Sequence, residues 1–213
     1  MSRFASIIAA SAALATAGCV SLLPEPRPNT LYRLAAADLD ASAPVTAPVT
    51  VLIDRISAPR GLAGDRIAIQ RSGAIAYMAG AAWISPGPQL MEGAVFDAFY
   101  NGAPLIAPAH AEDGVRARYE LDLDLRHFEA EYDQGEDAAP LVRTAVRARL
   151  IDRENRALVA ARTIESTARA TANRQGAIVA AFSSATDDAT RALATWTQDA
   201  VCTSADAPEA CGP

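Results

Sequence analysis

The amino-acid sequence predicts a single α/β domain, residues 31–201, with an α/β/α layered order and a mixed β-sheet. Segments 119–126 and 142–150 have the two-residue period of half-buried strands. Segments 89–101 and 174–201 place apolar residues at helical spacing. The order strands, helix, strands, helix suits a sheet with helices packed against it.

The first half of the domain combines short strands with one helix. Arg71-Ser72-Gly73 predicts a hairpin turn, because glycine readily takes the positive φ of such turns. The helix 89–101 presents Leu90, Met91, Val95, Phe96 and Phe99 on one side and stops at Asn101-Gly102. The expected strands of this half cover residues 31–34, 49–53, 65–70, 74–78 and 105–106.

The second half begins with the clearest strand pattern. Tyr119, Leu121, Leu123 and Leu125 alternate with charged residues, and the phase then breaks, since Phe128 falls on the charged parity. The break predicts a bulge or the end of burial. An acidic turn (132–140), a strand (142–150), a turn at Asn155 and a strand (158–168) are expected next.

The last helix carries an apolar stripe at steps of three and four, so we expect it to cover one face of the sheet. Trp196 continues the stripe and is interpreted as a core residue. The stripe consists of Ile178, Phe182, Ala185, Ala189, Leu193 and Trp196.

The N-terminus is typical of a bacterial lipoprotein precursor. Arg3 precedes an uncharged run, residues 4–17, that is too short for the roughly 20 residues of a membrane-spanning helix. Thr16-Ala17-Gly18-Cys19 resembles a lipobox, which predicts a signal peptide at 1–18 and lipidation of Cys19. Thr16 stands where a lipobox usually has leucine, so ordinary cleavage after residues 15–17 is the alternative. The absence of Asp after Cys19 favours the outer membrane.

Both ends of the predicted domain are flanked by irregular segments. Pro24, Pro26 and Pro28 make residues 19–30 an extended tether. Residues 202–213 form a polar tail, predicted to be flexible and pinned by a disulfide between Cys202 and Cys211, since exported proteins meet oxidising conditions.

The charge of the chain limits the classes of partner that it can bind. The chain has 19 basic residues, all arginine, against 25 acidic ones, a formal net charge of −6. Without a basic cluster it is a poor candidate for nucleic acid, and membrane attachment would have to come from the lipid. The sequence is compatible with a homo-oligomer.

Chemical motifs are sparse. The sequence has no nucleophile elbow, phosphate loop or dinucleotide fingerprint, so we predict no enzymatic activity and no cofactor. His127, Glu129 and Glu131 alternate as three metal ligands could, although a solvated strand end is the favoured interpretation.

Two other groups of residues are candidate binding sites. Arg143, Arg147 and Arg149 could meet lipid phosphates, but pairing with Glu120, Asp122 and Asp124 on the adjacent strand is the simpler explanation. Trp83 is more often a core residue, yet it lies beside Pro86 and Pro88, and this rigid junction is the candidate partner contact.

Taken together, these residues resemble the ABC-type transport auxiliary lipoprotein family, the paraquat-inducible protein C-like lipoproteins, over residues 19–200. The resemblance is carried by the order and spacing of Cys19, Leu31-Tyr32-Arg33-Leu34, Ile75-Ala76-Tyr77, Trp83, the Tyr119 strand reaching Phe128-Glu129, and Trp196. It implies an α/β/α domain without known catalytic residues. It also implies an outer-membrane periplasmic lipoprotein that works with an ABC permease and ATPase and an MCE-domain protein to move lipids, with phospholipid as the expected cargo.

Two function classes follow. The first is this non-enzymatic transport accessory, which would hold an MCE-domain partner at the periplasmic face of the outer membrane. The alternative is an anchored regulator of enzymes that synthesise the cell wall. The sequence leaves the lipid and the direction of transport open.

Overall fold

The computed structural model describes residues 28–35, 49–205 and 207–212. The predicted signal peptide, Cys19 and most of the tether lie outside these ranges. The strands are β1 (Thr30–Tyr32), β2 (Val49–Ile53), β3 (Arg66–Arg71), β4 (Ala74–Trp83), β5 (Ile106–His110), β6 (Tyr119–Glu131), β7 (Leu141–Asp152) and β8 (Ala157–Arg169). The two long helices are α2 (Gly87–Gly102) and α3 (Gln175–Cys202).

Strand β6 is the centre of an eight-stranded mixed sheet. On one side it pairs with β7 in antiparallel fashion along its length, and β7 pairs in turn with β8. On the other side its first residues pair in parallel with β2, and its last residues pair in parallel with β3. Beyond these lie β5 on one side, and β4 and β1 on the other. The predicted mixed α/β class is therefore confirmed.

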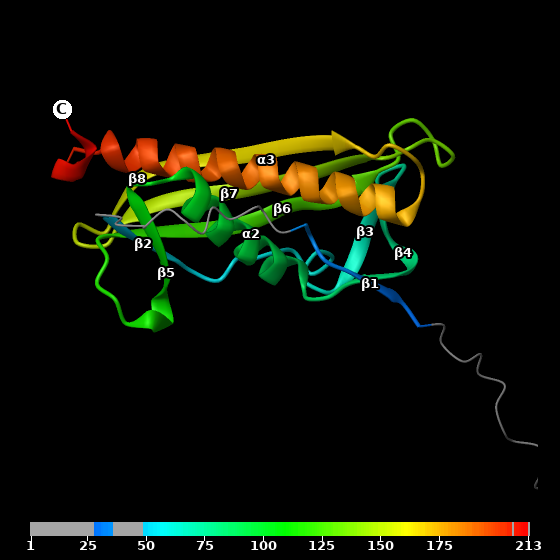
Figure 1. Cartoon of the computed structure of the whole chain (residues 1–213), viewed down its shortest axis with the longest axis horizontal. Coiled ribbons are helices and arrows are strands. Elements are labelled where there is room, and N and C mark those ends of the chain that lie inside the picture. Colours follow the sequence, from blue (N-terminus) through cyan, green and yellow to red (C-terminus); the bar gives the residue numbers. More distant parts are fainter. Residues whose placement is uncertain (1–27, 36–48, 206, 213) are drawn as a thin grey trace, which may run out of the picture.

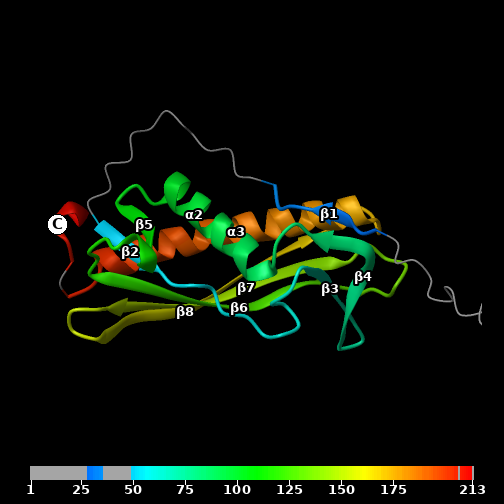
Figure 2. The ribbon, with the colours of Figure 1, turned by 90° about the horizontal axis from the view of Figure 1, so that it is seen from below.

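Both helices lie on the same side of the long strands β6, β7 and β8 (Figures 1 and 2). Helix α3 packs against these three strands, and α2 packs beside α3 and against β5. In the part of the chain that the structure describes, both long helices thus form a layer over one face of the sheet. The opposite face carries the charged residues of β6 and β7.

A bulge interrupts β6 where its hydrophobic phase breaks. The register against β7 shifts between Leu125 and His127, so that Arg126 is the extra residue. The extra residue reverses the parity and returns Phe128 and Ala130 to the face beneath the helices, where both are buried. Of the two outcomes that the sequence allowed, the bulge is observed and the end of burial is not.

Three aromatic side chains join the sheet to α3. Trp83 stacks on Phe128 with ring centroids 5.5 Å apart, and Phe182 meets both rings edge-on at 5.1 and 4.9 Å. All three are at most 2% exposed. Helix α2 starts close beside them, since a Cβ atom at Gly87 would lie 3.5 Å from a ring carbon of Phe128 and only 2.8 Å from the Leu62 carbonyl oxygen. Only glycine permits this approach.

Two local features match the residues that form them. Ser72 and Gly73, both at positive φ, join β3 to β4, as a two-residue hairpin turn requires. Helix α2 begins two residues before the predicted start. Pro88 is tolerated there because the amide groups of a first helical turn have no acceptor within the helix, so proline loses no hydrogen bond.

We expect the two aromatic residues of α3 to differ in their effect on stability. Phe182→Ala should lower the free energy of unfolding by about 3–5 kcal/mol, since it removes a fully buried ring from the core. Trp196, predicted to be core, is only partly buried, so Trp196→Ala should cost about 1–2 kcal/mol. Denaturant unfolding measures both values, and equal losses would contradict this assignment.

Candidate functional site

Trp83 is not a surface residue. It is 1% exposed and holds the aromatic cluster between the sheet and α3, so the prediction of a partner contact through Trp83 is wrong. The error has a physical cause: its neighbours Phe128 and Phe182 are remote in sequence, and the adjacent prolines suggested a loop. Ile84, the next residue, is the exposed one, at 51%.

Pro86 and Pro88 are partly exposed and line a cavity of about 590 Å³ beside the first turn of α2. Its walls also include Asp54, Glu92 and His110. A carboxylate oxygen of Glu92 lies 3.4 Å from His110 Nδ1, and the His110 ring stacks on Phe96 at 4.2 Å. The cavity is polar, and more carboxylates than arginines line it. It would therefore suit a cationic or hydrogen-bonding group of a partner.

The predicted metal set does lie together. The ligand atoms of His127, Glu129 and Glu131 are all within 4.8 Å of one another. The strand end is not solvated as favoured from the sequence, since Glu129 is only 4% exposed. Its carboxylate accepts hydrogen bonds from the Phe128 amide and pairs with His127 Nδ1, both at 2.6 Å. Glu131 pairs with Arg143 at 3.5 Å, and these partners account for the cluster without a metal.

The charged face of β6 and β7 is a set of cross-strand ion pairs. Arg149 pairs with Asp122, and Arg147 with Asp124 at 3.9 Å, as the simpler interpretation predicted. Arg143 instead bonds to Glu165 on β8 at 2.9 Å. The hydrogen bond from Arg143, and to a smaller extent the charge of Arg143, hold the pKa of the Glu165 carboxyl below its ordinary value. With these partners in place, the arginines are not a ready phosphate site.

A turn between β7 and β8 is held by one carboxylate that sequence reasoning missed. Asp152 accepts hydrogen bonds from the Glu154 and Asn155 amides at 2.9 and 3.1 Å and from Arg118 at 2.8 Å. The Arg118 hydrogen bond is the largest of the causes that lower the pKa of Asp152. The fivefold hydrogen bonding of this side chain is structural, and only the Asp-x-x-Asn spacing hinted at it.

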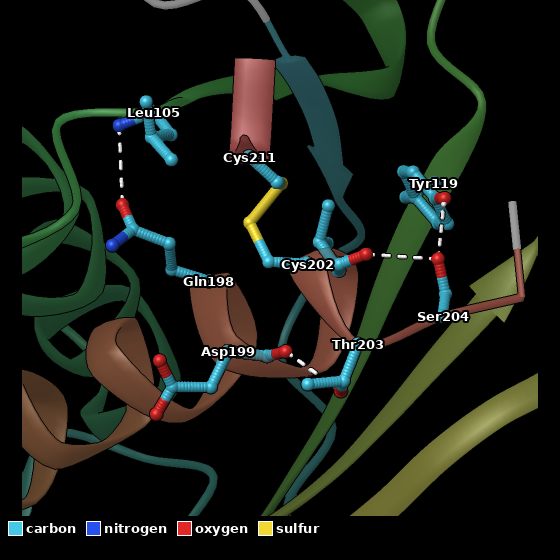
Figure 3. Close-up of a disulfide and its surroundings, with 9 residues drawn as sticks. Leu105, Tyr119, Gln198, Asp199, Cys202, Thr203, Ser204 and Cys211 are labelled. Atoms are coloured by element: carbon cyan, nitrogen blue, oxygen red, sulfur yellow. Dashed lines mark hydrogen bonds between the residues drawn. A yellow bond between two sulfur atoms is a disulfide. The ribbon is translucent and has the colours of Figure 1, made fainter. Parts of the chain in front are cut away.

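The C-terminal tail is attached to the end of α3 (Figure 3). Cys202 and Cys211 are joined by a disulfide across a separation of 9 residues. Ser204 Oγ lies 3.1 Å from the Tyr119 hydroxyl and donates to the Val201 carbonyl at 2.8 Å. Gln198, one turn before the disulfide, accepts a hydrogen bond from the Leu105 amide at 3.1 Å. These contacts place the tail against the start of β6, and the end of α3 against the loop before β5.

A groove of about 290 Å³ runs between α2 and α3 and was not predicted. Its α2 wall includes the small residues Gly93, Ala94 and Ala98. Ala35, after β1, also lines the groove, and its amide donates a hydrogen bond to Ser183 Oγ at 2.9 Å. Small residues within an amphipathic helix were the only signal in the sequence, and they do not say which helix lies opposite.

Neither helix in the described ranges is both long and apolar enough to span a bilayer. The predicted lipidation site, Cys19, lies outside the described residues.

Comparison with known proteins gives one family and several related folds. The model of the family described as ABC-type transport auxiliary lipoprotein component matches residues 32–194. No curated protein matches the chain. The solved structure of XCC0632 from Xanthomonas campestris is similar at a TM-score of 0.69 and 25% identity, covering 80% of this chain and 96% of that one.

Two more distant structures share the fold alone. An uncharacterised protein aligns at a TM-score of 0.64 with 13% identity, over 80% of this chain and 99% of its own. CT253 from Chlamydia trachomatis aligns at 0.50 with 10% identity, over 73% of this chain and 99% of its own. In both, the identity is too low to carry functional residues across.

We expect the disulfide to stabilise the tail more than the fold. Replacing Cys202 and Cys211 by serine should lower the free energy of unfolding by no more than about 3 kcal/mol, the value for so short a loop in the chain-entropy model. Calorimetry of the exported protein measures this change, and non-reducing mass spectrometry establishes the bond. Free thiols at both positions in protein taken from an oxidising compartment would contradict the pairing.

Proposed function

Because the chain belongs to the family of ABC-type transport auxiliary lipoprotein components, we propose that it is a non-enzymatic accessory of an ABC transport system that moves lipids together with an MCE-domain protein. The observation that carries the proposal is the match of the family model over residues 32–194, which takes in nearly the whole described domain. Phospholipid is the expected cargo.

The chemistry of the described side chains supports an accessory role over catalysis. The clusters of titratable groups, at His127 and at Arg143, are satisfied by one another through short hydrogen bonds and ion pairs. Catalytic groups usually keep a free position toward a substrate. A binding role needs only surfaces, and the domain offers two hollowed ones on the flanks of α2.

The proposed anchor is a lipid on Cys19, which would hold the domain at the periplasmic face of the outer membrane. Residues 20–30 separate that cysteine from the domain and could span at most about 35 Å when extended. The domain could thus reach a partner in the periplasm while it remains attached to the membrane.

The proposed contact with the MCE-domain partner is the cavity at Pro86 and Pro88. These prolines are partly exposed and restrict the backbone, so binding there would cost little conformational entropy. Glu92, on the next turn of α2, would contribute a charge to the interface.

Anchoring predicts a change of fractionation. Cys19→Ala should abolish incorporation of labelled palmitate and move the protein from the membrane to the soluble periplasmic fraction, since acyl chains supply the membrane affinity. A wild-type protein that fractionates as soluble, with its N-terminus at Gly18, would show that the signal peptide is an ordinary one.

Partner binding predicts a result by affinity capture. The tagged full-length protein, purified from detergent-solubilised membranes, should recover an MCE-domain protein and its permease. Glu92→Arg should lower that recovery by about tenfold, because it reverses a charge in the proposed interface. Asp199→Arg, the same charge reversal at an exposed position of α3, is the matched control and should leave recovery unchanged.

The outcomes separate the claims. Recovery of cell-wall synthases in place of an MCE-domain protein would overturn the transport function. Equal recovery by wild type, Glu92→Arg and Asp199→Arg would leave the function standing and exclude this surface.

A further inference from the structure

The groove between α2 and α3 has the size of a small-molecule site. Its volume of about 290 Å³ is at the lower end of the range for such sites, roughly 300–1,000 Å³. Its lining residues come from the segment after β1, from one side of α2 and from the facing side of α3.

Part of the groove lining is aliphatic. Leu34, Leu90, Ala94 and Ala98 contribute apolar surface, and Gly93 leaves its part of the trough open. A Cβ atom at Gly93 would meet nothing within 4 Å. None of the lining residues is aromatic, so the walls offer no ring on which a flat ligand could stack. A narrow aliphatic trough matches a polymethylene chain.

One buried hydroxyl in the wall lacks a partner. Ser183 Oγ donates to the Val179 carbonyl at 3.2 Å, and Thr190 Oγ1 donates to the Thr186 carbonyl at 3.0 Å. Thr186 also lines the groove and is 1% exposed, yet its Oγ1 has no hydrogen-bond partner among the described residues. A buried polar group left in this state is costly. Because the Thr186 hydroxyl is itself buried and the Ser183 and Thr190 hydroxyls already donate within their own helix, none of the three is left to donate a hydrogen bond to an occupant.

The rim has charges of both signs. Arg191 is already paired with Asp187 and with Asp188, the latter at 3.5 Å. Within the described residues, neither the Arg33 guanidinium nor the Asp97 carboxylate has an ion pair. Burial raises the pKa of the Asp97 carboxyl, as expected for a partly desolvated acid without a cation. A head group with one anionic and one cationic group would satisfy both residues.

We infer that the α2–α3 groove binds one acyl chain of a zwitterionic phospholipid, with the phosphate at Arg33 and the amine at Asp97. The guanidinium of arginine suits a phosphate, and a carboxylate suits an ammonium. The inference rests on the proposed function in that the transport system supplies the lipid, and it adds that this chain contacts the lipid itself.

A photoreactive lipid tests the inference on the intact protein. The full-length lipoprotein is reconstituted in vesicles that contain phosphatidylethanolamine with a diazirine on one acyl chain, irradiated and digested. Mass spectrometry should find the label on peptides from α2 and α3. Gly93→Leu should lower that labelling by roughly tenfold, because the new side chain fills the trough. Gly176→Leu is the matched control, an exposed helical glycine outside the groove with equal room for a Cβ atom, and should label as wild type does.

The head group is tested by competition. Unlabelled phosphatidylethanolamine should displace the probe better than phosphatidylglycerol, which lacks the amine, and Asp97→Asn should abolish that preference. Wild-type label that spares α2 and α3 would overturn the inference, whether residues 36–48 or a partner protein fill the groove instead. So would equal labelling of wild type and Gly93→Leu. Affinity capture of the MCE-domain protein is an independent readout, so this inference can fail while the proposed function stands.

Discussion

The structure depends on one constraint, which is that β6 must keep its apolar side chains beneath the helices while it changes its neighbour. Its first residues pair with β2 and its last with β3, so the same strand serves two parts of the sheet. The bulge at Arg126 lies between these two stretches. A bulge bends a strand and increases its twist, and here it also reverses the parity, which keeps Phe128 in the core. Without it, Phe128 would point away from the helices, toward the charged face, and the aromatic cluster with Trp83 and Phe182 could not form.

The opposite face of the sheet is held differently. Exposed ion pairs such as Arg149–Asp122 each contribute only about 0–1 kcal/mol, so this face adds little to stability beyond the backbone hydrogen bonds of its strands. The pairs engage the arginines and give the uncovered face a polar surface. Stability therefore comes from the helix-covered side, and the two hollows described above lie at the flanks of α2.

How much could be predicted from the sequence follows from the range of each interaction. The alternation from Tyr119 to Leu125 is local, and so is the Ser72-Gly73 turn, and both were predicted. Burial of Trp83 was the favoured interpretation, but its packing partners were not predicted, because Phe128 and Phe182 lie 45 and 99 residues further along the chain. The side of the sheet on which each helix packs is likewise set by the connections between strands, and neither helix's own pattern reports it. The groove depends on that placement and was invisible for the same reason.

Helix α2 is the element through which core and function meet. Its inner side is fixed by buried Met91, Val95 and Phe99, and its first turn by the close approach at Gly87. Its two flanks are then left to line different hollows, with Glu92 in the cavity at Pro86 and Pro88, and Gly93 and Asp97 in the groove beside α3. Because the core holds the helix rigidly between them, the position of one surface sets the position of the other. A partner bound at the first turn and a lipid bound along the helix would thus be held in a fixed relation to one another.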